Sequence, residues 1–167
     1  MSASDRISLV VAAATVVGCL ACGDSGVDPK KFDAVDAAAQ SVRADVHAHS
    51  GAGSARFAEL LEALQTQIAA VESRVSGRQE KALLKAYAEA AEAYKYFLRF
   101  RDLDRDAVGG MVLLRGANRP VALRFGIPFE ERGGGRWVNR KTAMDIFAAK
   151  ADAGLANTVR LRSGRSP

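Results

Sequence analysis

The sequence predicts a mainly α protein, an antiparallel three- to four-helix bundle with a short irregular or hairpin insertion around residues 108–129. Apolar residues recur at alternating spacings of three and four in three consecutive segments, the pattern of helices that pack lengthwise. Short Gly/Ser breaks separate these segments, so the helices should run up, down and up. The aromatic content of 7% and the abundance of alanine also favour closely packed helices.

The first helix is expected to begin at Asp28-Pro29, because aspartate caps free N–H groups and proline fits the first helical position. A helical domain should then span residues 29–161. The apolar stripe of the first helix consists of Phe32, Val35, Ala39, Val42, Val46 and His49.

The second and third helices follow from the same spacing. Ser50–Ser54 breaks the first helix, and Ser54 is expected to cap the second. Ser76-Gly77 breaks the chain again, and the third helix should fray and end within Arg99–Asp106. The second stripe consists of Phe57, Leu61, Leu64, Ile68, Val71 and Val75, and the third of Leu84, Tyr87, Ala91, Tyr94 and Leu98.

The pattern changes in Val108–Phe129, where two apolar runs flank a turn-forming segment, Gly116–Pro120. We expect either a small hairpin that pairs Met111–Arg115 with Val121–Phe125 or an ordered loop laid over the helices. The next segment, Glu130–Arg136, contains three consecutive glycines and is expected to be a flexible break.

A fourth helix is expected from Asn139 to near Leu161. Gly154 is a weak spot in it, since glycine costs roughly 1 kcal/mol relative to alanine in a helix. The tail Arg162–Pro167 is expected to be disordered. The stripe of this helix consists of Met144, Phe147, Ala151, Leu155 and Thr158.

The net charge of +5 is unevenly distributed along the chain. Asp24–Leu98 carries nine Lys/Arg and eleven Asp/Glu, whereas Arg99–Pro167 carries fourteen and seven. A basic C-terminal half could contact phosphate or an anionic lipid surface, although a solvated surface is the simpler interpretation. No nucleic acid is expected among the partners.

Residues 1–23 have the parts of a secretion signal: Arg6 in a short charged start, an apolar run from Ile7 to Gly18, and small residues before a cysteine. The run is shorter than the about 20 residues that a membrane-spanning helix needs. Val16-Val17-Gly18-Cys19 resembles the lipobox of bacterial lipoproteins, and Cys19-Leu20-Ala21-Cys22 is a poorer match. The resemblance implies diacylglycerol on the cysteine thiol, cleavage before it, and usually acylation, for example by palmitate, of the new amino terminus.

This resemblance divides the N-terminal part into a signal peptide, 1–18, and a lipidated cysteine with its tether, 19–28. The expected lipidation site is Cys19, with Cys22 as the alternative. The protein would then be exported and lipid-anchored in the cell membrane or outer membrane, facing the periplasm or the exterior. An ordinary cleaved signal and a free secreted protein remain the alternative. Both cysteines lie in this segment, which excludes a disulfide or cysteine-based metal site in the body.

His47 and His49 are the histidines of the chain. On the expected helix, residues two apart point in different directions, and helical zinc pairs are spaced by four. We therefore expect no metal site there and a structural role, either a salt bridge between Asp45 and His49 or a helix-end interaction.

Gly133-Gly134-Gly135 precedes the fourth helix and has Arg132, Arg136 and Arg140 around it. A phosphate-binding loop needs a lysine and a hydroxyl residue after its last glycine, and neither is present. A connector is the expected role, although the start of a helix can bind an anion.

An aromatic cluster lies near the end of the third helix. Tyr96 is expected to face outward, and Arg99 and Arg101 beside the cluster could form an aromatic–arginine face for a planar or sugar ligand. Core packing is the default interpretation. The residues expected in the core or at its seam are Tyr87, Tyr94 and Phe97, and Phe100 completes the cluster.

No catalytic residue, metal ligand or cofactor site is assigned from the sequence. Glu130-Glu131 is the only adjacent acid pair, and no serine or cysteine nucleophile in the body has a recognisable histidine and acid beside it. The favoured function is a structural or protein-interaction module that offers helix faces to a partner. The alternatives are a ligand-binding or enzymatic domain that uses the aromatic and arginine region 94–140, or contact of the basic half with an anionic surface.

Overall fold

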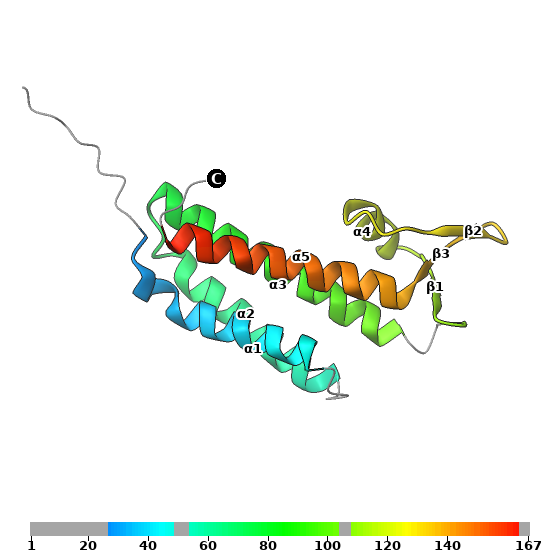
Figure 1. The fold of residues 1–167 in the computed structure, drawn as a ribbon, viewed down its shortest axis with the longest axis horizontal. Helices are drawn as coiled ribbons and strands as arrows, with labels where there is room; N and C mark the ends of the chain where they lie inside the picture. Colours follow the sequence, from blue (N-terminus) through cyan, green and yellow to red (C-terminus); the bar gives the residue numbers. More distant parts are fainter. Residues whose placement is uncertain (1–26, 49–53, 104–107, 164–167) are drawn as a thin grey trace, which may run out of the picture.

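The computed structural model describes residues 27–48, 54–103 and 108–163, which form a mainly helical protein with a small three-stranded antiparallel sheet (Figure 1). The mainly α class is therefore confirmed, and the sheet is an addition to it. The predicted signal peptide, both cysteines, most of the tether, His49 and residues 164–167 of the predicted tail lie outside the described residues.

The chain enters its first helix as predicted. A 3-10 turn, η1 (Pro29–Phe32), leads directly into α1 (Asp33–His47). The Asp28 carboxylate accepts a hydrogen bond from the Lys30 backbone N–H at 3.1 Å, which caps the turn. The predicted stripe is buried at Phe32, Val35, Ala39 and Val42 and partly buried at Val46.

The next two helices are α2 (Ser54–Glu72) and α3 (Arg78–Asp102). The α2 stripe is buried at Phe57, Leu61, Leu64 and Val71 and partly buried at Ile68, whereas Val75 lies beyond the end of the helix. The buried face of α3 is wider than the predicted seam because α3 packs against both α2 and α5. Its buried residues include Leu83, Ala86, Tyr87, Ala90, Ala91, Ala93, Tyr94, Phe97 and Phe100.

The last helix, α5 (Arg140–Arg162), begins where the sequence predicts. The Asn139 side chain accepts a hydrogen bond from the Thr142 N–H at 3.0 Å and caps the helix. The helix continues through Gly154 and includes Arg162, so the prediction of disorder is wrong for that residue. The buried residues of the predicted stripe are Phe147, Ala151, Leu155 and Thr158.

The four long helices lie alongside one another (Figure 1). The most extensive contact joins α3 and α5, followed by the contacts of α1 with α2 and of α2 with α3. At one end of the molecule, Arg162 donates a hydrogen bond to the Pro29 carbonyl oxygen at 3.1 Å, which brings the first and last turns together. The sheet lies toward the opposite end (Figure 1).

The predicted pairing of Met111–Arg115 with Val121–Phe125 is wrong. Strand β1 (Met111–Leu113) pairs instead with β3 (Gly135–Asn139), and α4 (Asn118–Arg124) occupies most of the second segment. Val121 and Ala122 are buried, so the apolar run provides the buried face of a short helix rather than a strand.

The predicted flexible break at Glu130–Arg136 is also wrong, because it forms a tight hairpin. Strand β2 (Glu130–Arg132) pairs with β3, which gives the sheet the order β1-β3-β2. Gly133 and Gly134 connect the two strands with φ of +57° and +75°. Positive φ at both central residues is what a two-residue type I′ turn requires, and glycine adopts it without strain.

Candidate functional site

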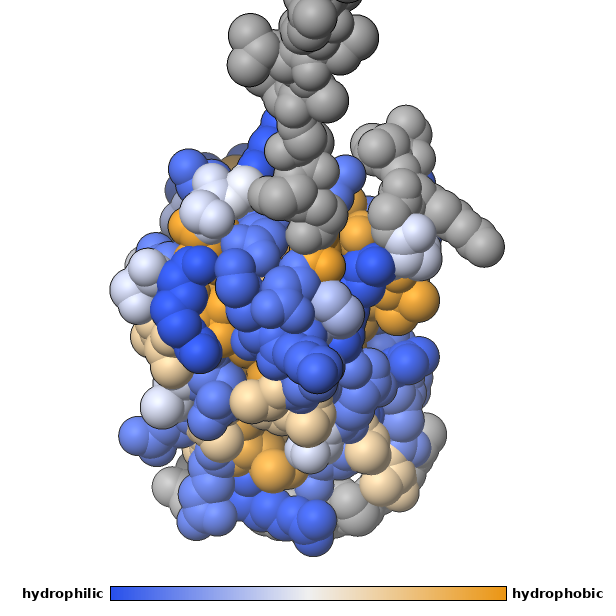
Figure 2. Space-filling view, turned by 90° about the vertical axis from the view of Figure 1, so that its left-hand side faces the viewer, coloured by the Kyte–Doolittle hydropathy of each residue, from blue (hydrophilic) through white to orange (hydrophobic). Residues whose placement is uncertain are grey.

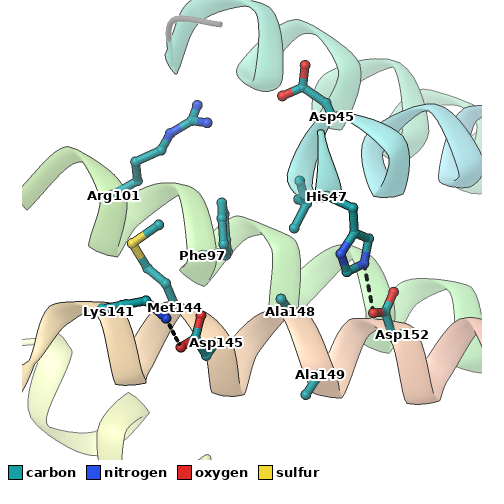
Figure 3. A pocket seen from close by; sticks show the side chains of 11 residues that line it. Asp45, His47, Phe97, Arg101, Lys141, Met144, Asp145, Ala148, Ala149 and Asp152 are labelled. Carbon is teal, nitrogen blue, oxygen red and sulfur yellow. Dashed lines mark hydrogen bonds and ion pairs between the residues drawn. The ribbon is translucent and has the colours of Figure 1, made fainter. Parts of the chain in front are cut away.

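A cavity of about 480 Å³ lies where the C-terminal part of α1 meets α3 and α5 (Figure 3). This volume is within the range of about 300–1,000 Å³ that is typical of small-molecule sites. The cavity is lined by Asp45, Val46 and His47 of α1, by Phe97 and Arg101 of α3, and by Lys141, Met144, Asp145, Ala148, Ala149 and Asp152 of α5.

Helical spacing places these side chains on common faces. Phe97 and Arg101 are four residues apart on α3, and Met144, Ala148 and Asp152 follow one another at intervals of four on α5. Residues four apart lie on the same side of a helix. α3 and α5 therefore each contribute one face to the cavity, whereas the residues from α1, Asp45, Val46 and His47, are consecutive and lie at the end of that helix.

Arg101 brings an uncompensated cation to the cavity. Its guanidinium lies over the Phe57 ring, with 4.9 Å from Cζ to the ring centroid. Its Nε and Nη2 atoms are buried and have no hydrogen-bond partner among the described residues. Buried N–H donors without acceptors cost free energy, so an acceptor that reached them would bind favourably.

Asp45 brings a carboxylate that is only half satisfied. Its side chain is 4% exposed, and its Oδ1 lies 3.6 Å from the Nε of Arg56. Its Oδ2 is buried and lacks a partner within the described part of the chain. Asp45 and Arg101 reach toward the same space from α1 and α3 (Figure 3). The cavity therefore offers an acceptor and a donor pair that are both unused.

The other charges that line the cavity are paired. The Nζ of Lys141 lies 2.7 Å from the Oδ2 of Asp145. The two oxygens of Asp152 lie 2.9 Å from the Nε of Arg43 and 2.9 Å from the Nε2 of His47. Among the described charged groups of the lining, the buried atoms without a hydrogen-bond partner are Nε and Nη2 of Arg101 and Oδ2 of Asp45.

Within the described residues, no group of three or more histidine, cysteine, aspartate or glutamate side chains is placed to hold a metal ion. His47 interacts with Asp152 at the edge of the cavity. Its predicted neighbour His49 lies outside the described residues, and so does the predicted salt bridge between Asp45 and His49. Asp45 instead faces Arg56.

The predicted aromatic core is confirmed for Tyr87, Tyr94 and Phe97, and Phe100 is buried with them. The prediction that Tyr96 faces outward is wrong. Its ring lies 5.5 Å from that of Phe125 and 5.8 Å from that of Phe147, measured between centroids. The expected aromatic–arginine face is divided, because Arg101 and Phe97 line the cavity whereas Arg99 is exposed on another side of α3.

The triglycine segment is a hairpin turn and not the entrance to a helix. Of the nearby arginines, Arg132 pairs with Glu130, and the Nε of Arg136 lies 3.1 Å from the Oε1 of Glu131. The adjacent acid pair therefore serves as the ionic partner of the hairpin arginines. Arg140 donates to the Arg101 carbonyl oxygen at 3.3 Å and ties the start of α5 to the end of α3.

Comparison of the chain with protein-family models, with curated proteins and with solved structures gave no match. Within residues 27–48, 54–103 and 108–163, no helix has both the length and the apolar character required to cross a membrane.

Proposed function

We propose that this chain is an exported protein, anchored to a membrane by lipid on Cys19, whose helical body binds a small molecule and does not catalyse a reaction. The observation that carries the binding role is the cavity between α1, α3 and α5, with its unused donors on Arg101 and its unused acceptor on Asp45. Cys22 is the alternative attachment site.

The scaffold we propose is the antiparallel bundle that the heptad spacing predicts. Its support is the pairwise packing of α1 with α2, α2 with α3, and α3 with α5. In such a bundle, ligand sites form from side chains on facing helices, and the cavity has that location.

The proposed anchoring rests on the lipobox resemblance and fits the position of the N-terminal end of the body. Helical structure starts at Pro29, shortly after the two cysteines. The face of the molecule at this end is mostly hydrophilic, with small separate apolar areas (Figure 2). A hydrophilic face beside the tether favours a body that stands off the bilayer and does not insert into it.

A protein-interaction role through helix faces has less support, because the apolar stripes are used inside the body. The large hydrophobic side chains that remain exposed in the described residues are spread over different elements. They are Val108, Leu123, Phe129 and Val159. Protein docking remains the second candidate function, and its surface would have to be mainly polar.

Contact of the basic half with an anionic surface has less support for a similar reason. Five of its basic side chains have an acidic partner within the described fold, which reduces the charge available to a polyanion. The paired side chains are Arg124, Arg132, Arg136, Lys141 and Arg162, with Glu92, Glu130, Glu131, Asp145 and Asp33 as their partners.

A binding role is favoured over an enzymatic one by the composition of the cavity wall. Among the described residues of the wall, His47 lies beside Asp152, and none is a serine, threonine or cysteine that this pair could activate. The few charged groups of the wall instead lie among apolar side chains, as in binding sites where a few polar groups orient a ligand on an apolar surface.

Metabolic labelling with palmitate tests the anchoring. We expect the label in the wild-type chain and in Cys22→Ala, and its loss in Cys19→Ala. Loss in Cys22→Ala alone would move the attachment to Cys22, and unchanged labelling of the double variant would refute anchoring. Mass spectrometry of the mature amino terminus identifies the lipidated residue directly.

Filling the cavity tests the binding role. Ala148→Trp places a large ring inside the cavity, whereas Ala156→Trp places the same ring on an exposed part of α5 and serves as the control. With a panel of amino acids, carboxylates, amines and sugars, we expect the thermal shift that a bound compound causes in the wild type to vanish in Ala148→Trp and to persist in Ala156→Trp. Equal shifts in all three proteins would refute binding in this cavity.

A further inference from the structure

We infer that the cavity binds a small molecule that carries a carboxylate and an adjacent N–H donor on a hydrophobic body, the chemistry of an apolar amino acid or of the C-terminal residue of a peptide. This inference rests on the proposed binding function and assigns a ligand class to the same cavity.

The carboxylate is assigned to Arg101. Its unpartnered atoms, Nε and Nη2, lie on one edge of the guanidinium and present two parallel N–H bonds. Two parallel donors match the two oxygens of a carboxylate in a bidentate arrangement. The Phe57 ring below the guanidinium restrains its plane, so the donor pair is oriented before a ligand arrives.

The N–H donor is assigned to Asp45. Its buried Oδ2 accepts nothing within the described residues, and its Oδ1 has only the longer contact of 3.6 Å with Arg56. An ammonium or amide N–H would satisfy this oxygen. Since Asp45 and Arg101 line the same cavity from different helices, one ligand that carries both a carboxylate and a donor can serve both (Figure 3).

The hydrophobic body is assigned to the surface that Phe97, Met144 and Ala148 form on α3 and α5. An aromatic ring and a flexible thioether can adapt to side chains of different shape, whereas Ala148 leaves room for them. A ligand without an apolar part would leave this surface uncovered.

The balance of charges makes a polyanion a poor ligand. The lining contains the carboxylates of Asp45, Asp145 and Asp152 and the cations of Arg101 and Lys141. A phosphate group with two negative charges would meet three carboxylates in this lining, and the charge of Lys141 is already shared with Asp145 at 2.7 Å. A single carboxylate beside a positive or neutral donor fits this distribution better.

Isothermal titration calorimetry of the full chain with L-phenylalanine and close analogues tests the inference. Phenylalanine methyl ester lacks the carboxylate, and hydrocinnamate lacks the amine. We expect each analogue to bind about tenfold or more weakly than phenylalanine, because each leaves one buried charged group without its partner. Glycyl-phenylalanine distinguishes a free amino acid from the C-terminal residue of a peptide as the ligand. Tighter binding than phenylalanine identifies a peptide C-terminus, and weaker binding identifies a free amino acid.

Substitutions of Arg101 and Asp45 test which residue binds the carboxylate and which binds the N–H donor. In Arg101→Met the preference for phenylalanine over its methyl ester should disappear, and in Asp45→Asn the preference for phenylalanine over hydrocinnamate should shrink. Arg99→Met removes the same charge from an exposed position of α3 and should keep both preferences. Arg101→Lys retains the cation without the parallel donors and should fall between the wild type and Arg101→Met. Circular dichroism melting checks that each variant is folded.

Equal binding of phenylalanine and its methyl ester would overturn the assignment to Arg101 and with it the ligand class. If phenethylamine or a sugar bound instead, and Ala148→Trp abolished that binding, the ligand class would fall while the proposed binding function stood. If no compound of the panel bound in a manner sensitive to Ala148→Trp, both would fall.

Discussion

Gly154 of α5 lies directly against Ala90 of α3, so that a Cβ added to Gly154 would stand 3.2 Å from the Ala90 Cβ and 3.4 Å from the Ala86 carbonyl oxygen. Glycine has a low intrinsic helix propensity, and at this position its lack of a side chain permits close contact between α3 and α5. Small residues at facing positions therefore set the separation of these helices at this point.

Enlarging Gly154 should separate α3 from α5. We expect Gly154→Leu to lower the free energy of unfolding by about 1–3 kcal/mol through overpacking. Gly154→Ala should change it by less, because a gain of about 1 kcal/mol in helix propensity is offset by crowding against Ala90. Urea denaturation measures both, with Ala156→Leu on the exposed side of α5 as the control. A Gly154→Leu protein as stable as the wild type would contradict the close packing.

The turn between β2 and β3 should reject β-branched residues. Gly133 and Gly134 both have positive φ, a conformation that costs roughly 1–2 kcal/mol for each residue with a Cβ. We expect Gly134→Val to destabilise the hairpin by about that amount, whereas Gly133→Asn should be tolerated because Asn-Gly is a favoured type I′ pair. Amide hydrogen exchange in β3 reports the result. Equal protection in Gly134→Val and Gly133→Asn would argue against this turn geometry.

The Glu80 side chain links the start of α3 to the start of the helical body. It is 5% exposed, and its Oε1 accepts a hydrogen bond from the Nζ of Lys31 at 2.8 Å, while its Oε2 accepts one from the Ser76 N–H at 3.2 Å. The hydrogen bond from Lys31 is the main cause that lowers the pKa of Glu80, and burial opposes it. Glu80→Gln should therefore lower the free energy of unfolding at neutral pH by about 1–3 kcal/mol.

The lowered pKa also fixes the direction of the pH dependence. A carboxyl group with a lower pKa in the folded state stabilises the fold above its ordinary value of 4.5 and loses this contribution as the pH falls through its folded value. The free energies of unfolding of the wild type and Glu80→Gln should therefore differ most near neutral pH and become equal in acid. Glu59→Gln, at an exposed position of α2, is the control. A constant difference at every pH would exclude this linkage.

Tyr87 should make the fold sensitive to alkali. Burial raises its pKa from 10.0 to about 12, and its hydroxyl donates a hydrogen bond to the Oδ1 of Asp36 at 2.9 Å. Because the folded state favours the neutral phenol, its contribution is complete below pH 10 and is lost as the pH rises toward 12. Burial also raises the pKa of Tyr94 above its ordinary value of 10.0.

Tyr87→Phe separates these effects. It removes one hydrogen bond, which should lower the free energy of unfolding at neutral pH by about 0.5–1.5 kcal/mol. It also removes one titrating group, so the loss of stability in alkali should be smaller than in the wild type. Tyrosinate absorbance and denaturation, followed at increasing pH, give the two readouts. An unchanged alkaline profile would show that Tyr87 does not control this transition.

The helices could be predicted because their signals are local. The Asp28 cap and Pro29 mark the start of the first helix, and Asn139 marks the start of the last. Apolar residues at spacings of three and four mark the buried stripe of a helix, and this pattern does not depend on which neighbouring helix covers it. The greater width of the α3 face could not be predicted in this way, because it depends on how many neighbours α3 has.

The sheet was mispredicted because its pairing is not local. The sequence favours a hairpin between neighbouring apolar runs, but β1 pairs with β3 across the intervening α4. A run as short as Val121–Phe125 has no periodicity that separates strand from helix. Three glycines are compatible with both a flexible connector and a type I′ turn, and the pairing of the flanking residues decides between them.

The candidate site was predictable only in part. Arg101 and Phe97 stand out in the sequence as members of an aromatic–arginine cluster, and Asp45 as a possible partner of His49. That Arg101 and Asp45 are buried without full partners depends on the approach of α1, α2 and α3, which no local pattern encodes. The spacing of Ala148 and Asp152 by four was a usable signal that they share a face, but nothing in the sequence links that face to α1.

The contact between Arg162 and Pro29 has a practical consequence for measuring orientation. It places both ends of the described fold together, whereas the β2–β3 hairpin lies at the far end (Figure 1). A fluorophore attached after Ser163 would report from the end of the body where Pro29 lies, and one inserted between Gly133 and Gly134 would report from the opposite end. Quenching by labelled phospholipids, compared between the two positions, measures which end lies nearer a bilayer if the proposed anchor holds the body there.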